Sequence, residues 1–193
     1  MSYDIRLMTP DGETAQLPRG FAARGGTVPA AVDPLSGALV QVPVADAAVN
    51  VTYNYSRYYY EATGSADFPV EIGEDCGGIR CVYGLTPEQS IPVLRAMVDG
   101  IMDRYLVDGV WVDSERERRR LFDDDGSEVS FPEMLSRGLS DGDLHVVVET
   151  YTVSEGDMSD YWEATAANAI APLEDMLRMA TLMVGVDCVW DGD

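Results

Sequence analysis

The chain has 193 residues with 34 acidic side chains, 13 basic side chains and one histidine, which gives a formal net charge of −21. All 13 basic residues are arginine, so mechanisms that need a Schiff-base lysine, a P-loop lysine or a Ser–Lys dyad are excluded. The acidity argues against a protein that grips nucleic acid through a broad basic surface, so we expect no direct binding to nucleic acid.

The length and the apolar fraction of 46% predict one globular domain that spans residues 1–193. No run of residues approaches the ~18 apolar positions that a membrane helix needs, and the N-terminal stretch lacks the apolar core of a signal peptide. We therefore expect a protein of the bacterial cytoplasm with no membrane partner. The three cysteines, Cys76, Cys81 and Cys188, form no C-x-x-C pair and are expected to be reduced thiols.

The N-terminal part of the chain is predicted to be mostly strand. Four segments have the alternating or β-branched pattern of strands: 3–8, 13–17, 38–44 and 48–55. A Pro- and Gly-containing turn at 9–12 predicts a hairpin between the first two. The Gly- and Pro-rich residues 18–37 are predicted to form a long loop. In the fourth strand, one face would hold Asn50, Thr52 and Asn54.

Two principal helices are predicted, at about 86–105 and about 165–183. Thr86 and Gln89 form a capping-box pattern at the start of the first, and apolar residues then recur at helical spacing. An internal proline, Pro92, is expected to bend this helix or shift its start. The second helix has an apolar stripe and can be capped by Thr165.

Between the helices the sequence predicts a strand at 106–112, a charged hairpin over 116–131 and a long strand at 144–153. Strand and helix segments that do not alternate regularly predict the α+β class, with a mainly antiparallel sheet.

No catalytic or metal-binding motif is apparent, and no cofactor is expected. His145 lies in a predicted strand, where a structural or surface role is favoured over catalysis. The segment 123–126 resembles a calcium loop, but it lacks the carboxylates that an EF-hand needs at its first and last positions, so it reads as an acidic turn. The only basic cluster is Arg116 with 118–120. It could contact phosphate, but pairing with the chain's own acids is favoured.

Tyrosines and amides concentrate in two segments, 50–60 and 161–168. Tyrosine combines a large apolar body with a polar tip, so these segments can build either a recognition surface or an ordinary core. The start of the last helix could also accept an anion. The candidate residues for binding a ligand or partner are Asn50, Thr52, Asn54, Tyr55, Tyr58, Tyr60, Arg80, Tyr83, Tyr161, Trp162, Thr165, Asn168 and Trp190.

The negative charge is concentrated toward the C-terminal end. Residues 1–60 have a net charge of −1, residues 61–110 of −6 and residues 111–193 of −14. An acidic surface is therefore predicted in the last part of the chain. Its candidate residues are Asp123, Asp124, Asp125, Glu128, Asp141, Asp143, Glu155 and Asp157.

Several blocks together resemble a family of small acidic proteins encoded by phages and prophages. The blocks are 50–56, Gly78-Ile79-Arg80, 83–86, 90–94, 161–168 and 190–193. Relative to the shorter members, 28–47 and 106–158 look like extensions, so the resemblance implies an inserted acidic hairpin region within the domain at about 106–158. The resemblance implies a viral or prophage origin and, as a recurring role of such proteins, inhibition of host defence. It implies no catalytic residue.

Two functional hypotheses follow. The first is a binding protein, such as an anti-CRISPR protein, that occupies the basic nucleic-acid channel of a host nuclease, for example a CRISPR effector. The alternative is a small-molecule or nucleotide binder that uses the tyrosine-rich strand, Arg80 and the start of the last helix. Binding is favoured over catalysis, and the sequence leaves the oligomeric state open.

Overall fold

The computed structural model describes residues 2–21, 30–32, 39–41, 44–66, 68–69 and 77–192. Contacts along the chain divide it into two compact units, Met1–Val112 with Gly156–Asp193, and Asp113–Glu155. The second unit lies inside the segment 106–158, which the sequence marks as an insertion. The predicted α+β class and the antiparallel pairing of the strands are confirmed.

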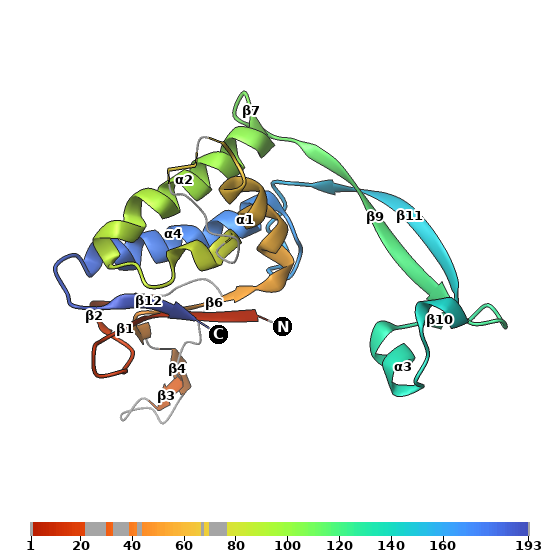
Figure 1. Cartoon of the computed structure of the whole chain (residues 1–193), viewed down its shortest axis with the longest axis horizontal. Coiled ribbons are helices and arrows are strands. Elements are labelled where there is room, and N and C mark those ends of the chain that lie inside the picture. Colours follow the sequence, from red (N-terminus) through yellow and green to blue (C-terminus); the bar gives the residue numbers. More distant parts are fainter. Residues whose placement is uncertain are drawn as a thin grey trace. The chain divides into compact units, whose positions relative to one another are not determined.

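The sheet of the first unit joins the two ends of the chain (Figure 1). Its central strand β1 (Ser2–Met8) pairs antiparallel with β12 (Val189–Gly192) on one side and with β6 (Ala48–Thr52) on the other. The predicted strand at 3–8 is therefore confirmed. Along β1 every second side chain is buried in the core, namely those of Tyr3, Ile5 and Leu7.

Shorter ribbons follow β1 along the chain. Their strands are β2 (Gln16–Phe21) with β5 (Val44–Asp46), and β3 (Ala30–Val32) with β4 (Leu39–Gln41). The predicted hairpin after β1 is present as a single bridge between Met8 and Thr14. The predicted loop at 18–37 is wrong in both of its described parts, 18–21 and 30–32, because backbone pairing forms strands there. The rest of that loop lies outside the described residues.

Two helices, α2 (Pro87–Tyr105) and α4 (Ala166–Leu182), pack against each other and form a layer beside the sheet (Figure 1). Both match their predicted ranges. The capping box of α2 is confirmed, since Thr86 and Gln89 exchange hydrogen bonds, and α2 begins at Pro87 without displacement by Pro92. Within the described residues, no helix combines the length and the apolar character that crossing a membrane requires.

The predicted strand at 48–55 is wrong beyond Thr52. The chain continues as a short 3-10 helix, η1 (Tyr53–Tyr55), and then as helix α1 (Ser56–Thr63), which the sequence prediction missed. Tyr55, Tyr58, Tyr59 and Ala62 are all buried, at the i, i+3, i+4, i+7 spacing of one helical face. That spacing was present in the sequence, but the β-like composition of the segment concealed it.

Two further short elements of the first unit flank α2 along the chain. Residues 78–82 form the 3-10 helix η2 (Gly78–Val82), which packs against α1. The predicted strand at 106–112 is a small hairpin made of β7 (Leu106–Val107) and β8 (Val110–Trp111). Asp108 and Gly109 turn the chain with φ values of 52° and 78°, which is the left-handed turn that hairpins favour.

The second unit is a long two-stranded ribbon. Residues 123–144, which connect its two strands, form a small closed end. β9 (Asp113–Phe122) pairs antiparallel over its whole length with β11 (His145–Ser154). The predicted charged hairpin is present at the end of β9, where β10 (Glu128–Val129) pairs with Phe122 and Leu121. Helix α3 (Phe131–Ser136) and the 3-10 helix η3 (Asp141–Asp143) complete the closed end. Val129 and Met134 are buried there.

Candidate interaction surfaces

The two tyrosine- and amide-rich segments, 50–60 and 161–168, meet in the first unit. The hydroxyl of Tyr55 donates to the carbonyl of Tyr161, and that of Tyr58 donates to the carbonyl of Ala164 at 2.7 Å. In return, the hydroxyl of Tyr161 donates to the carbonyl of Asn50 at 2.8 Å. The polar tips of these tyrosines therefore bind the chain's own backbone.

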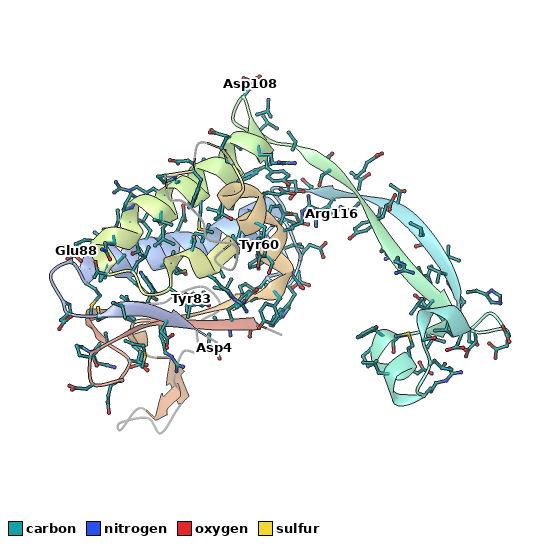
Figure 2. The ribbon with its side chains drawn as sticks, viewed as in Figure 1. Asp4, Tyr60, Tyr83, Glu88, Asp108 and Arg116 are labelled. Atoms are coloured by element: carbon teal, nitrogen blue, oxygen red, sulfur yellow. The ribbon has the colours of Figure 1, made fainter. Side chains whose placement is uncertain are left out.

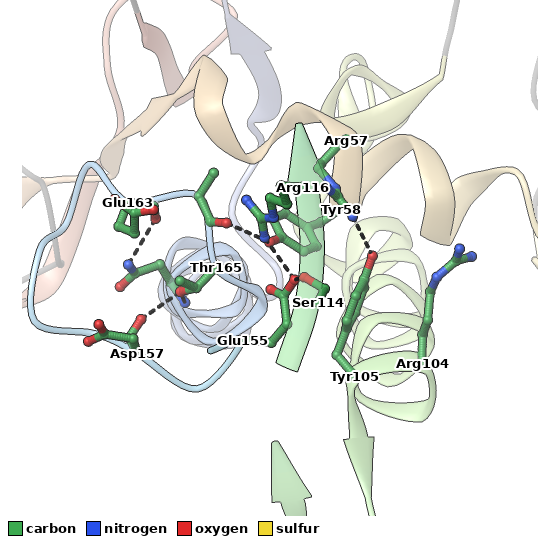
Figure 3. Close-up of polar contacts among 12 residues, drawn as sticks. Arg57, Tyr58, Arg104, Tyr105, Ser114, Arg116, Glu155, Asp157, Glu163 and Thr165 are labelled. Carbon is green, nitrogen blue, oxygen red and sulfur yellow. Dashed lines mark hydrogen bonds and ion pairs between the residues drawn. The ribbon is translucent and has the colours of Figure 1, made fainter. Parts of the chain in front are cut away.

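Amide and hydroxyl side chains fix the same segment from other directions. Asn54 Nδ2 donates to the carbonyl of Trp162 at 2.8 Å. Thr165 Oγ1 donates to the carbonyl of Asp157 at 2.6 Å, and Asn168 Nδ2 donates to the carbonyl of Glu163 at 3.0 Å (Figure 3). Thr165 also accepts from the backbone N–H of Asn168, which caps α4 as expected. These contacts give the tyrosines and amides of the segment a structural role, which accounts for its unusual composition.

Six of the thirteen candidate binding residues are buried in the core. The buried members of the set are Thr52, Tyr55, Tyr58, Thr165, Asn168 and Trp190. The indole N–H of Trp190 donates to Ser90 Oγ at 2.8 Å inside the core. Of the two readings that composition left open for these segments, core and recognition surface, the contacts favour the first.

A few members of the set do face solvent. Trp162 is 56% exposed and Tyr60 is 52% exposed. Tyr60 lies over η2, so close that a Cβ added at Gly77 would lie 2.7 Å from its ring (Figure 2). Arg80 is exposed, with its guanidinium 6.0 Å from the ring centre of Tyr3, and Tyr83 is half-buried. These side chains are spread over several elements.

Three members of the predicted acidic surface, Asp123, Asp124 and Asp125, lie at the closed end of the second unit. Asp124 is 99% exposed and lies 3.2 Å from Nε2 of His145. Asp125 accepts from the backbone N–H of Ser127 at 2.9 Å, and this bond lowers the pKa of its carboxyl. Asp123 is paired with Arg137 at 2.9 Å. We refer to residues 123–126 as the acidic turn.

The other acidic candidates are held in similar ways. The carboxyl of Asp143 accepts from the Ser140 hydroxyl and backbone N–H, and that of Asp157 accepts from the N–H of Ser159, so both have a lowered pKa. Glu128 pairs with Arg120, which lowers the pKa of the glutamate. The backbone of Asp141 lies in η3, and its side chain is outside the described part of the structure.

The prediction that Glu155 belongs to the acidic surface is wrong, because its side chain is 0% exposed. Arg116 approaches its Oε1 at 2.7 Å and Ser114 also bonds to it (Figure 3). The buried arginine supplies the charge that makes the buried carboxylate tolerable. Sequence position in an acidic stretch did not indicate this partner.

The arginine cluster pairs with the chain's own acids, as predicted. Because β9 is a strand, Arg116, Arg118 and Arg120 point to one face of the ribbon. Arg118 and Arg120 contact the two carboxylate oxygens of Glu149 at 2.9 Å and 2.8 Å. Pairing with Glu128 and Glu149 raises the pKa of Arg120 and lowers that of Glu149.

The apolar side chains that the second unit exposes were not predicted from the sequence. Val146, Val147 and Val148 on β11 are 38%, 44% and 55% exposed, and Tyr151 is 37% exposed. Near the closed end, a shallow hollow of about 360 Å³ is lined in part by Leu121, Val129 and Phe131. The run of valines in β11 was the available signal, but a buried strand has the same pattern.

The described residues contain no group of three or more His, Cys, Asp or Glu side chains that could hold a metal ion. A scan against protein-family models finds no match for the chain, and searches of curated proteins and of solved structures find none either.

Proposed function

We propose that the protein is a non-catalytic binding protein that inhibits a host defence nuclease, such as a CRISPR effector. It would do so by placing carboxylates in the basic nucleic-acid channel of that nuclease. The observation that carries the proposal is the acidic turn. Asp124 is almost fully exposed there, and Asp125 is oriented by the N–H of Ser127. Carboxylates held on a turn can compete with phosphates for arginine and lysine on a partner.

The charge of the whole chain supports the same proposal. With a net charge of −21, the protein is attracted over a long range to a basic channel and repelled by the nucleic acid that the channel binds. The carboxyls of Asp125, Asp143 and Asp157 have lowered pKa values, so they stay ionised in mildly acidic solution as well. The resemblance to phage and prophage proteins supports a defence enzyme as the target.

Nuclease inhibition at two salt concentrations tests this proposal. We expect inhibition by the wild-type protein that weakens steeply as salt rises. The double variant D124N/D125N should inhibit much more weakly, because it removes two charges while the amide oxygen at 125 can still accept from Ser127.

The matched control is D11N/E13Q, which removes the same number of charges from an exposed turn of the first unit. It should inhibit as the wild type does. The proposal would be refuted if the wild-type protein, added in excess at low salt, inhibited no candidate nuclease. Equal losses in the two double variants would refute it as well, because inhibition would then not depend on the acidic turn.

The alternative, a binder of nucleotides or other small molecules, has less support. It depends on Tyr55, Tyr58 and Asn54, whose polar tips bond to backbone carbonyls of the chain. A ligand would have to replace those bonds. If any member of a nucleotide panel raised the melting temperature in proportion to its concentration, this alternative would become the better one.

A further inference from the structure

Strand β11 presents a long edge. Over His145–Ser154 it pairs with β9, and within the described residues no strand lies along its other side. An open edge offers a row of backbone N–H and C=O groups to any strand that approaches. A two-stranded ribbon is also only marginally stable in water by itself. The arrangement therefore favours the addition of a further strand.

The two strands of the ribbon differ in how strongly their side chains discourage pairing with a further strand. β9 has three acids and four arginines among its ten residues, and charged side chains of this kind discourage pairing. β11 has one acid, Glu149, and one histidine among its ten residues, and its three successive valines are exposed. The edge that is open to pairing is thus that of β11.

We propose that β11 pairs antiparallel with β11 of a second copy of this chain, with Val147 on the two-fold axis. This register places Val147 opposite Val147 of the second copy and Val146 opposite Val148. It also places His145 of each copy opposite Glu149 of the other. A two-fold interface must be self-complementary, and this short segment meets that condition in shape and in charge.

The charge of the ribbon permits such a contact in a very acidic protein. Residues 116–122 and 145–152 contain four arginines and two glutamates, so this part of the ribbon is free of the acidic excess found elsewhere. Glu149 stays ionised because Arg118 and Arg120 bond to it. An apolar strand that places one histidine opposite one glutamate on each side of the axis suits a second copy better than a strongly charged partner strand.

Sedimentation of the purified protein over a dilution series tests the proposal. The wild type should show a concentration-dependent monomer–dimer equilibrium. Val147→Lys should be monomeric throughout, because it places two positive charges opposite each other on the axis. Val110→Lys is the matched control, since Val110 is 68% exposed on the hairpin of the first unit, and it should dimerise like the wild type.

Cysteine crosslinking tests the register and does not depend on a charge change. Val147→Cys should form a disulfide-linked dimer on mild oxidation, whereas Thr150→Cys on the same strand should not, each compared with the parent chain. Circular dichroism checks that every variant is folded. A monomeric wild type, a dimer that survives Val147→Lys, or equal crosslinking at 147 and 150 would overturn the proposal.

The outcome is separable from that of the proposed function. The D124N/D125N variant removes the Asp124 contact of His145 at the end of the paired segment, but it leaves the three valines at its centre unchanged. It should therefore still dimerise even if it no longer inhibits a nuclease. If the ribbon instead joined a strand of a host protein, that complex would form while the free protein stayed monomeric, which counts against the pairing of two copies.

Discussion

Arg116 Nη2 lies 2.7 Å from Oε1 of Glu155, in an ion pair whose side chains are 8% and 0% exposed. The two residues lie at the ends of β9 and β11 that are remote from the acidic turn. A buried ion pair adds little stability relative to an apolar pair, but removing one partner leaves an uncompensated charge. The pair is therefore a point at which the ribbon is sensitive to single substitutions.

Glu155→Gln should destabilise the second unit by about 3–5 kcal/mol, because Arg116 would remain buried without its counter-charge. Hydrogen exchange of the β9 and β11 amides measures the effect directly. Glu115→Gln, at an exposed position of β9, is the control and should change protection little. Similar loss of protection in both variants would show that the buried pair has no special importance.

Tyr59→Phe should lower the free energy of unfolding by about 1–3 kcal/mol, because it leaves a buried hydrogen bond unmade. In the wild type the hydroxyl of Tyr59 is fully buried and donates to the carbonyl of Ala169 at 2.9 Å. Tyr60→Phe changes the neighbouring, half-exposed tyrosine in the same way and should cost much less. Urea unfolding of the two variants makes the comparison, and equal losses would contradict the assigned role of Tyr59.

Alkaline pH should destabilise the first unit through the same residue. Burial, with nearby tyrosines, raises the pKa of Tyr59 well above its ordinary value of 10.0. The folded state thus binds this proton more tightly than the unfolded state does. The resulting stability is complete below about pH 10 and is lost as the pH rises toward the folded pKa. Urea midpoints above pH 10 should fall less steeply for Tyr59→Phe than for the wild type, and identical slopes would refute the prediction.

Ser90→Ala should destabilise the contact between α2 and β12. Ser90 Oγ accepts from the indole N–H of Trp190 and donates to the carbonyl of Pro87 at 2.9 Å, and both side chains are buried. We expect a loss of about 1–3 kcal/mol, because the indole N–H would lose its partner. Thermal unfolding followed by tryptophan fluorescence gives the measurement. Ser136→Ala on exposed α3 is the control, and it should leave the transition of the first unit unchanged.

Acid should destabilise the second unit by protonating its hydrogen-bonded carboxylates, Asp125 and Asp143. The carboxyl of Asp143 accepts two bonds from Ser140, which lower its pKa, so the stability it contributes is present above the unfolded pKa of about 3.8 and is lost as the pH falls through the folded value. In an NMR titration, the carboxyls of Asp143 and Asp125 should protonate below the ordinary aspartate value of 3.8. Titration of either carboxyl at or above that value would contradict this assignment.

The sequence was most informative where local rules decide the structure. The capping box at Thr86 and the apolar stripes predicted α2 and α4 within a residue or two. The alternation of 3–8 predicted β1, and the Asp-Gly turn at 123–126 predicted the end of β9. Each of these signals is contained in a short segment and depends little on distant contacts.

The candidate site was harder to predict, because its meaning depended on partners far away in the chain. Tyr55 and Tyr58 bond to carbonyls 106 residues later, and Tyr59 bonds to one 110 residues later. Nothing in the segment 50–60 identifies those carbonyls, so a core and a binding surface look alike in sequence. The same holds for Glu155, whose burial follows from pairing with Arg116 across the ribbon.

By itself the sequence determined the composition-level properties of this protein: a net charge of −21, the absence of lysine, and the positions of the two long helices. Charge and local periodicity are additive properties of residues, so they need no fold. Only the tertiary structure decided which polar groups are used internally and which edge stays open, because burial and pairing depend on segments that meet in space. The tyrosines thus became part of the core, and β11, a run of valines in the sequence, became an exposed strand edge.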